Sequence, residues 1–289
     1  MNDTYLVVGG DSLVGRGLVH ALIQRGKNVY SSTRRRDSVN ARRVYLDFER
    51  NDDFELPRDV SYVFVVAAAT NYQRCEKDPL AYKVNVELIP RLVASLLAKG
   101  IFVTFISTNS IFGGEIPWPN EDSPHYPSIP YAIQKDQAES LIKSSAIQLN
   151  AELRLNIVRL TKIMARNVPP LPSWFDAWER GETVHPFSDL IFAPLSIQFV
   201  SKALSIIGEQ RVPGNLHLSG SDNVSYADFA LYLGKAIGIN PRLITPTTAT
   251  AKGIDIAFKP SFSGLGMVRT EALTGLQSQK LADVVSDLL

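Results

Sequence analysis

The chain has 289 residues, of which 45% are hydrophobic and 20% charged, with a formal net charge of +1. This composition is typical of a globular enzyme and excludes global disorder, and the near-neutral charge argues against a nucleic-acid partner. The single cysteine, Cys75, excludes an intramolecular disulfide and favours a cytoplasmic location, and the longest apolar run, residues 60–69, falls far short of the roughly 20 residues that cross a membrane.

Short apolar runs alternate with helical patterns through the first half of the chain, which predicts a parallel sheet with crossover helices. We expect strands at residues 5–8, 28–32, 43–46, 62–67, 102–106 and 155–160, and helices at residues 13–24, 79–97 and 131–149. Further along, a helix is expected at residues 196–207, a short strand at 216–218 and a helix at 226–237.

Between these two parts the pattern changes. Prolines cluster at Pro169, Pro170 and Pro172, beside Trp174 and Trp178. Because consecutive prolines cannot continue a helix or a central strand, we expect a loop or a domain crossing here.

We therefore predict an α/β fold with a Rossmann-type, doubly wound parallel sheet and a smaller C-terminal α/β domain for the substrate. Residues 1–165 would form the nucleotide-binding domain, with a returning segment near residues 190–212. Residues 166–189 and 213–289 would form the smaller domain.

A glycine-rich loop joins the first predicted strand to the first predicted helix. Gly9 permits a tight turn and close approach of a pyrophosphate, and Gly15 lets the helix pack against the strand. Ser12 can donate to a phosphate oxygen, and Leu13 and Val14 open the helix whose N-terminal amides attract anions. The alternative is a purely structural glycine turn.

The end of the second strand indicates which dinucleotide binds. An acidic residue there suits the ribose 2′-hydroxyl of NAD, whereas Thr33, Arg34 and Arg35 suit the 2′-phosphate of NADP(H). Asp47 can accept from the adenine amino group, with Phe48 beside it. The alternatives are a solvated basic loop and a surface aspartate.

A tyrosine and a lysine lie one helical turn apart at Tyr131 and Lys135. A nearby ammonium favours the phenolate, which lowers the tyrosine pKa from its ordinary value of about 10 toward neutrality. Thr108, at the end of the fifth strand, can hydrogen-bond a carbonyl beside the tyrosine. The alternatives are a chance tyrosine–lysine pair and an ordinary β-branched strand residue. The four histidines lack metal-ligand spacing, so no metal site is predicted.

Several motifs occur in the order found in extended short-chain dehydrogenases, and the chain most resembles the dTDP-4-dehydrorhamnose reductase family over nearly its whole length. The matching segments are Gly9-x-x-Ser12-x-x-Gly15, Ala67-Ala68-Ala69, Ser107-Thr108, Tyr131-x-x-x-Lys135, Gly214-Asn215-Leu216-His217 and Lys259-Pro260-x-x-Ser263-x-Leu265.

The resemblance implies that NADPH reduces the 4-keto group of a nucleotide-linked deoxy-sugar. Tyr131 would protonate the oxygen, Lys135 would hold the nicotinamide ribose, and Thr108 would orient the carbonyl. The cofactor would be lined by Ala67, Ala68 and Ala69, and the sugar by Thr70, Asn71, Thr108, Asn109 and Tyr131.

The chain departs from the family pattern after the fifth strand. Asn109 replaces an aspartate and Ser110 a tyrosine, and the missing acidic pair counts against dehydration. Two alternatives remain: an epimerase of the same superfamily, and a non-catalytic NADP-binding regulatory subunit. A homodimer through the helices near residues 79–97 and 131–149 is expected by fold analogy only.

Overall fold

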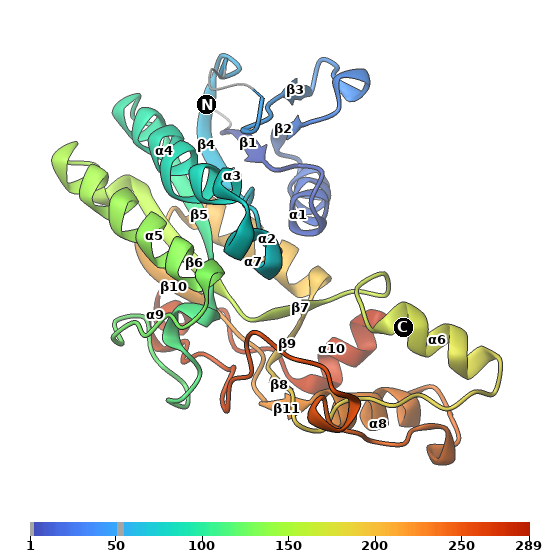
Figure 1. Cartoon of the computed structure of the whole chain (residues 1–289). Helices are drawn as coiled ribbons and strands as arrows, with labels where there is room; N and C mark the ends of the chain where they lie inside the picture. Colours follow the sequence, from blue (N-terminus) through green and yellow to red (C-terminus); the bar gives the residue numbers. More distant parts are fainter. Residues whose placement is uncertain (1–2, 51–54) are drawn as a thin grey trace.

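The computed structural model describes residues 3–50 and 55–289. Its central element is a seven-stranded parallel sheet in the order β10-β6-β5-β4-β1-β2-β3 (Figure 1). The strands are β1 (Thr4–Val8), β2 (Asn28–Thr33), β3 (Arg43–Tyr45), β4 (Val60–Val65), β5 (Phe102–Thr108), β6 (Leu155–Leu160) and β10 (Gly214–Leu218). This sheet confirms the predicted Rossmann-type fold.

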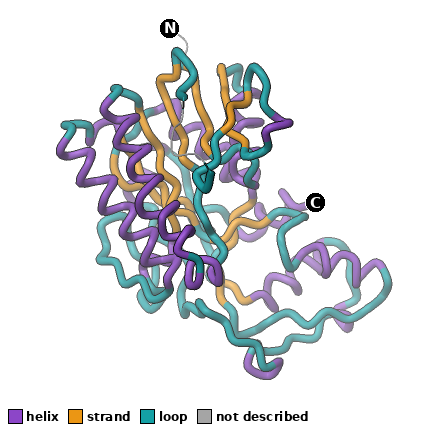
Figure 2. The backbone as a smooth tube through the Cα atoms, turned by 45° about the horizontal axis from the view of Figure 1, so that its top comes forward, coloured by secondary structure: helices purple, strands orange, loops and turns teal. Residues whose placement is uncertain are grey.

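Helices cover both faces of the sheet (Figures 1 and 2). On one face lie α1 (Leu13–Gln24) and α7 (Ile197–Gln210), and on the other α4 (Ile89–Ala98) and α5 (Pro130–Gln148). Side chains alternate along each strand, so β1 sends Tyr5 and Val7 to the α1/α7 face and Leu6 and Val8 to the α4/α5 face. Burial on both faces explains why the strands are continuous apolar runs.

The helix predicted at residues 79–97 is interrupted. The structure has α3 (Pro79–Tyr82), a π-helical segment (Lys83–Leu88) and then α4, whose first turn contains Pro90. A proline donates no backbone hydrogen bond and disturbs the preceding turn, so a change of helical geometry just before it is the expected compensation. A short helix, α2 (Tyr72–Lys77), precedes α3 and was not predicted.

The prediction of a loop around the proline cluster was partly wrong. A helix, α6 (Leu171–Glu179), begins directly after Pro170 and contains Pro172 in its first turn, where no intrahelical donor is needed. Trp174 and Trp178 lie one turn apart, and both are buried.

The α6 helix packs with α8 (Tyr226–Ala236) and α10 (Leu281–Leu288) around a separate apolar cluster, away from the large sheet (Figure 1). Two small sheets, β7 (Lys162–Met164) with β9 (Pro194–Ser196) and β8 (Ile191–Phe192) with β11 (Val224–Ser225), accompany it, and α9 (Val268–Thr274) packs near β10. We propose that this cluster is the core of the smaller domain. Among the described residues, no helix combines the length and apolar character needed to span a membrane.

A buried ion pair joins α5 to the neighbouring sheet strand β6. The side chains of Arg159 and Glu139 are almost completely buried. The guanidinium donates two hydrogen bonds to the carboxylate, with lengths of 2.7 Å and 3.1 Å. The same guanidinium donates to the Glu121 carbonyl and contacts His217 and His125. Burial raises the pKa of Glu139, but the Arg159 hydrogen bonds and charge outweigh it and lower the pKa to about 2.

Replacing Arg159 with alanine leaves the Glu139 carboxylate buried, with only Nζ of the partly exposed Lys143, 3.3 Å away, to balance its charge. We therefore expect Arg159→Ala to lower the free energy of unfolding by about 3–5 kcal/mol in urea titrations. The control is Arg180→Ala, because Arg180 pairs with Glu182 at 2.8 Å while both side chains are more than half exposed; we expect a loss of at most about 1 kcal/mol. Equal losses in the two variants would show that the buried pair has no special role.

Candidate functional site

The site begins where the neighbouring strands β1 and β4 end. Gly9 follows β1 with a φ of +93°, and a Cβ at this position would lie only 2.8 Å from the Ala67 backbone nitrogen. Gly9 also donates its amide to Ser32 Oγ at 2.8 Å, which ties the loop to β2. Only glycine therefore allows the ends of β1, β2 and β4 to come this close together.

The loop continues directly into α1. A Cβ on Gly15 would lie 2.2 Å from the Gly9 carbonyl oxygen, so this glycine sets the close packing of helix on strand. Ser12 caps the helix: its Oγ accepts from the Gly15 amide at 3.0 Å and donates to the Gly9 carbonyl at 2.8 Å. The hydroxyl proton of Ser12 therefore serves the loop in this structure, and a contact with a phosphate stays a prediction. First-turn amides such as those of Leu13 and Val14 are suited to an anion.

A cavity of about 400 Å³ opens at this edge of the sheet. Nine predicted cofactor residues line it: Gly9, Ser12, Thr33, Arg34, Asp47, Phe48, Ala67, Ala68 and Ala69. Two residues predicted for the sugar, Thr70 and Asn71, line the same cavity. Sequence reasoning missed other lining residues: Asp11, Ser32, Leu46, Glu49, Val66, Arg74 and Val84.

Five predicted cofactor residues are not among those lining this cavity. Leu13 and Val14 lie behind Ser12 in the first turn of α1, and Arg35 turns toward Asp11, with 3.0 Å between Nη2 and Oδ1. Tyr131 and Lys135 lie on α5, next to the end of the cavity: Tyr72, which follows Asn71, packs its ring 5.4 Å from that of Tyr131.

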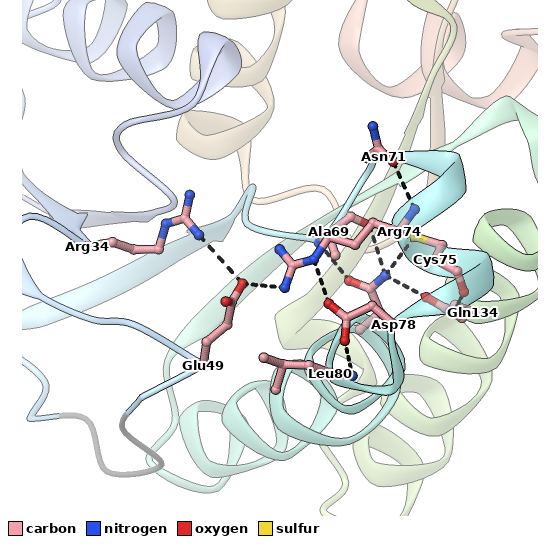
Figure 3. Close-up of polar contacts among 10 residues, drawn as sticks. Arg34, Glu49, Ala69, Asn71, Arg74, Cys75, Asp78, Leu80 and Gln134 are labelled. Atoms are coloured by element: carbon pink, nitrogen blue, oxygen red, sulfur yellow. Dashed lines mark hydrogen bonds and ion pairs between the residues drawn. The ribbon is translucent and has the colours of Figure 1, made fainter.

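One edge of the cavity is bridged by charged side chains. Glu49 lies between Arg34, at 3.7 Å, and Arg74, at 2.9 Å, and Arg74 also contacts Asp78 at 2.9 Å (Figure 3). These residues come from the end of β2, the segment after β3, and α2. Asp47 is buried beside them and accepts from the Glu49 amide at 3.1 Å.

The wall of the cavity is also joined to α5. Asn85, on the π-helical segment, accepts from the Ala69 amide and donates to the Ala69 carbonyl, both at 2.9 Å. It also donates to Gln134 Oε1 at 2.9 Å, and Gln134 in turn donates to the Cys75 carbonyl (Figure 3). Gln134 directly precedes Lys135, so these bonds set the position of the Tyr131–Lys135 turn relative to the cavity.

Tyr131 lies near Thr108, but the groups that set its pKa differ from those predicted. Burial and the neighbouring Tyr72 raise the pKa of Tyr131, and a hydrogen bond with Thr108 offsets only part of this rise. Lys135 is 2% exposed; its Nζ donates to the Ile106 carbonyl at 2.7 Å and lies 3.9 Å from the Phe105 ring centroid. The expected lowering of the tyrosine pKa is therefore absent, because the ammonium bonds to the backbone in a dry environment.

The same dry environment acts on Lys135 itself. Burial disfavours the ammonium and lowers its pKa from 10.5 to about 7, although Glu139 one turn away opposes this. Lys135 therefore loses its proton far more readily than an exposed lysine does.

The polar side chains of Thr108 and of the two residues after it form hydrogen bonds within the protein, which leaves them less available to a substrate. Thr108 Oγ1 lies 3.0 Å from Ser110 Oγ and accepts from the Ser110 amide at 3.2 Å. Asn109, predicted to contact the sugar, donates Nδ2 to the carbonyl and hydroxyl oxygens of Ser263, at 2.9 Å and 3.0 Å. In the described part of the chain, no group of three or more His, Cys, Asp or Glu residues could hold a metal ion.

A family model for the RmlD substrate binding domain matches residues 3–289. The chain belongs to this family. Among curated protein sequences, none matches this chain.

Solved structures share the fold of this RmlD-family chain over nearly its whole length. A dTDP-4-dehydrorhamnose reductase from Clostridium acetobutylicum has a TM-score of 0.82 at 21% identity, covering 99% of this chain and 98% of that one. One from Bacillus anthracis in complex with NADP has a TM-score of 0.81 at 17% identity, covering 100% and 98%. MoeE5 in complex with UDP-glucuronic acid and NAD has a TM-score of 0.78 at 21% identity, covering 99% and 98%.

The lowered pKa of Lys135 has a consequence for stability. In the unfolded chain this lysine keeps its ordinary pKa of 10.5, so between about pH 7 and 10.5 the unfolded state binds more protons and stability rises with pH. We expect the free energy of unfolding of the wild type, relative to Lys135→Met, to increase across this interval by up to about 1.4 kcal/mol per pH unit in urea titrations.

The matched control is Lys99→Met, because Lys99 is exposed at the end of α4. We expect the difference between the wild type and this variant to be independent of pH. A pH-independent difference for Lys135→Met as well would contradict a Lys135 pKa near neutrality.

Proposed function

We propose that this protein is an NADPH-dependent reductase of the 4-keto group of a nucleotide-linked deoxy-sugar. The observation that carries the proposal is the position of the Tyr131 phenol, near Thr108 at the end of β5 and beside a cavity that Gly9 keeps open. A proton donor and a second hydroxyl beside a dinucleotide cavity are the groups that carbonyl reduction requires.

The cavity fits a nicotinamide dinucleotide. The close contact of Gly9 with Ala67 leaves backbone, rather than side chains, at the start of α1, where a pyrophosphate binds best. Thr33 and Arg34 would hold the adenosine end, Asp47 and Phe48 the base, and Ala67, Ala68 and Ala69 the middle of the molecule. When bound, the reduced nicotinamide supplies a hydride.

The residues around Tyr131 provide the proton and orient the carbonyl. The raised pKa keeps the phenol protonated at neutral pH, so Tyr131 can donate its proton to the oxygen of the reduced carbonyl. Thr108 donates a hydrogen bond to the same oxygen and holds it beside the phenol. Lys135 can exchange a proton near neutral pH because its pKa is about 7.

Two kinds of structurally similar protein support the choice of substrate. The dTDP-4-dehydrorhamnose reductases act on nucleotide-linked sugars according to their names, and MoeE5 was solved with UDP-glucuronic acid and with UDP-glucose. Thr70 and Asn71, at the Tyr131 end of the cavity, would lie next to the sugar. An ion pair at 2.7 Å between Lys259 and Asp189 connects the Lys259-Pro260 segment, which the sequence resemblance matched to the reductases, to the segment before β8.

The activity test is loss of NADPH absorbance with a panel of nucleotide-linked 4-keto-6-deoxy sugars. We expect turnover by the wild type and a loss of about 10²-fold or more in Tyr131→Phe, because the variant lacks the proton donor. Tyr126→Phe is the control, since the Tyr126 side chain is 56% exposed and outside the cavity; it should keep wild-type activity.

The other outcomes separate the alternatives. Interconversion of sugar epimers without net NADPH consumption would favour an epimerase. Binding of NADPH without turnover of any sugar would favour a regulatory subunit, and full activity of Tyr131→Phe would contradict the assigned proton donor.

The preference for NADPH rests on the arginines after β2. We expect NADPH to bind more tightly than NADH, and Arg34→Ala to weaken NADPH binding about tenfold while leaving NADH binding nearly unchanged, as measured by calorimetry. Arg36→Ala is the control, because Arg36 stacks on the Tyr45 ring at 4.3 Å and is not among the residues lining the cavity. Equal weakening of both cofactors by Arg34→Ala would contradict a contact with the 2′-phosphate.

A further inference from the structure

Asp11 lies in the glycine loop, but its carboxylate reaches the end of β2. Oδ2 accepts from the Thr33 hydroxyl at 2.7 Å and from the Arg34 amide at 3.3 Å. Oδ1 accepts from the Arg35 guanidinium at 3.0 Å and makes a short contact with the Arg43 guanidinium. One carboxylate thus accepts hydrogen bonds from the last residue of β2, from the two arginines that follow it, and from Arg43 on β3.

The carboxylate is charged and is open to the cavity. Asp11 lines the cavity together with Thr33 and Arg34, whereas Arg35 and Arg43 are not among its lining residues. Burial raises the pKa of Asp11, but hydrogen bonds from Thr33 and Arg35 outweigh it and hold the pKa below the ordinary value. At neutral pH a ligand in this part of the cavity therefore meets a negative charge with two guanidinium groups bonded to it.

This position matters for the choice of dinucleotide. In dinucleotide-binding sheets, the end of the second strand meets the adenosine ribose, where an acid accepts from a 2′-hydroxyl and an arginine binds a 2′-phosphate. Here β2 is followed directly by the three arginines Arg34, Arg35 and Arg36, while the acid that lines the cavity beside them is supplied by the glycine loop. An acid and an arginine, Asp11 and Arg34, therefore both line the cavity at the end of β2.

We propose that Asp11 sets the discrimination between dinucleotides with a 2′-hydroxyl and those with a 2′-phosphate. The carboxylate accepts a hydrogen bond from the hydroxyl. It repels the phosphate in the part of the cavity that Thr33 and Arg34 also line. This inference rests on the proposed function only in requiring a nicotinamide dinucleotide in the cavity; it is independent of the sugar and of turnover.

The test is direct binding of NADPH and NADH to the wild type and to Asp11→Asn, measured by calorimetry. The asparagine keeps the shape and one acceptor oxygen but removes the charge. We expect NADPH to bind more tightly and NADH more weakly, so that the ratio of their Kd values shifts about tenfold or more toward NADPH. The fragments 2′,5′-ADP and 5′-AMP should show the same shift, which assigns it to the ribose substituent.

The control is Asp37→Asn, which makes the same change of net charge at an exposed position near Arg35 and outside the set of cavity-lining residues. It should leave the ratio unchanged. Thermal unfolding verifies that each variant is folded, and Asp11→Ser replaces Asp11→Asn if the latter is not.

Three results would overturn the inference. Equal weakening of both dinucleotides by Asp11→Asn would show that Asp11 only supports the loop, and an unchanged ratio would show that it does not contact the ribose substituent. The same shift in Asp37→Asn would assign the effect to net charge. Failure of the wild type to bind either dinucleotide would instead contradict the proposed function, and with it the premise of the inference.

Discussion

The close approach of Gly9 to Ala67 is the constraint on which the rest of this structure depends. Because the backbone nitrogen of Ala67 lies where a side chain on Gly9 would begin, the ends of β1 and β4 meet with no side chain between them. The cavity forms at this junction, and α1 starts directly above it. A larger residue at position 9 would push the loop away from β4 and close the space that a ligand needs.

The second requirement is a rigid position for α5. The buried Arg159–Glu139 pair connects this helix to β6, and Asn85 and Gln134 connect it to the cavity wall at Ala69. These polar groups are buried and paired, so a displacement of α5 would break several bonds together. The same exclusion of water that strengthens these bonds also raises the pKa of Tyr131 and lowers that of Lys135. Rigidity and unusual protonation in this site thus have one physical origin.

Much of the fold could be predicted from the sequence, because the strands are continuous apolar runs and α1 and α5 follow recognisable start signals. The short helices α2 and α6 could not, since too few residues carry a periodic pattern and the prolines conceal it. In the site, Gly9 was predictable from its place after the first strand, and the cavity-lining alanines from the family resemblance. The role of Asp11 was not, because its partner Arg43 lies 32 residues away and is brought close only by the pairing of β2 with β3.

Similarly, spacing alone placed Tyr131 and Lys135 on one helical face but could not indicate the direction of the Lys135 ammonium. That direction depends on the Ile106 carbonyl, which belongs to another element. The family resemblance assigned Asn109 to the substrate, whereas in the folded chain its side-chain amide donates to Ser263, which is distant in sequence.

The bridge made by Arg34, Glu49 and Arg74 has a consequence for how a ligand would enter. Arg34 is 66% exposed, and the side chains of Glu49 and Arg74 are about one-third exposed, so dissolved ions screen these contacts. Rising ionic strength loosens the bridge between β2 and α2 while leaving the buried bonds around α5 almost unaffected. Salt therefore weakens the charged edge of the cavity, whereas the buried hydrogen bonds that position Tyr131 and Lys135 do not depend on it.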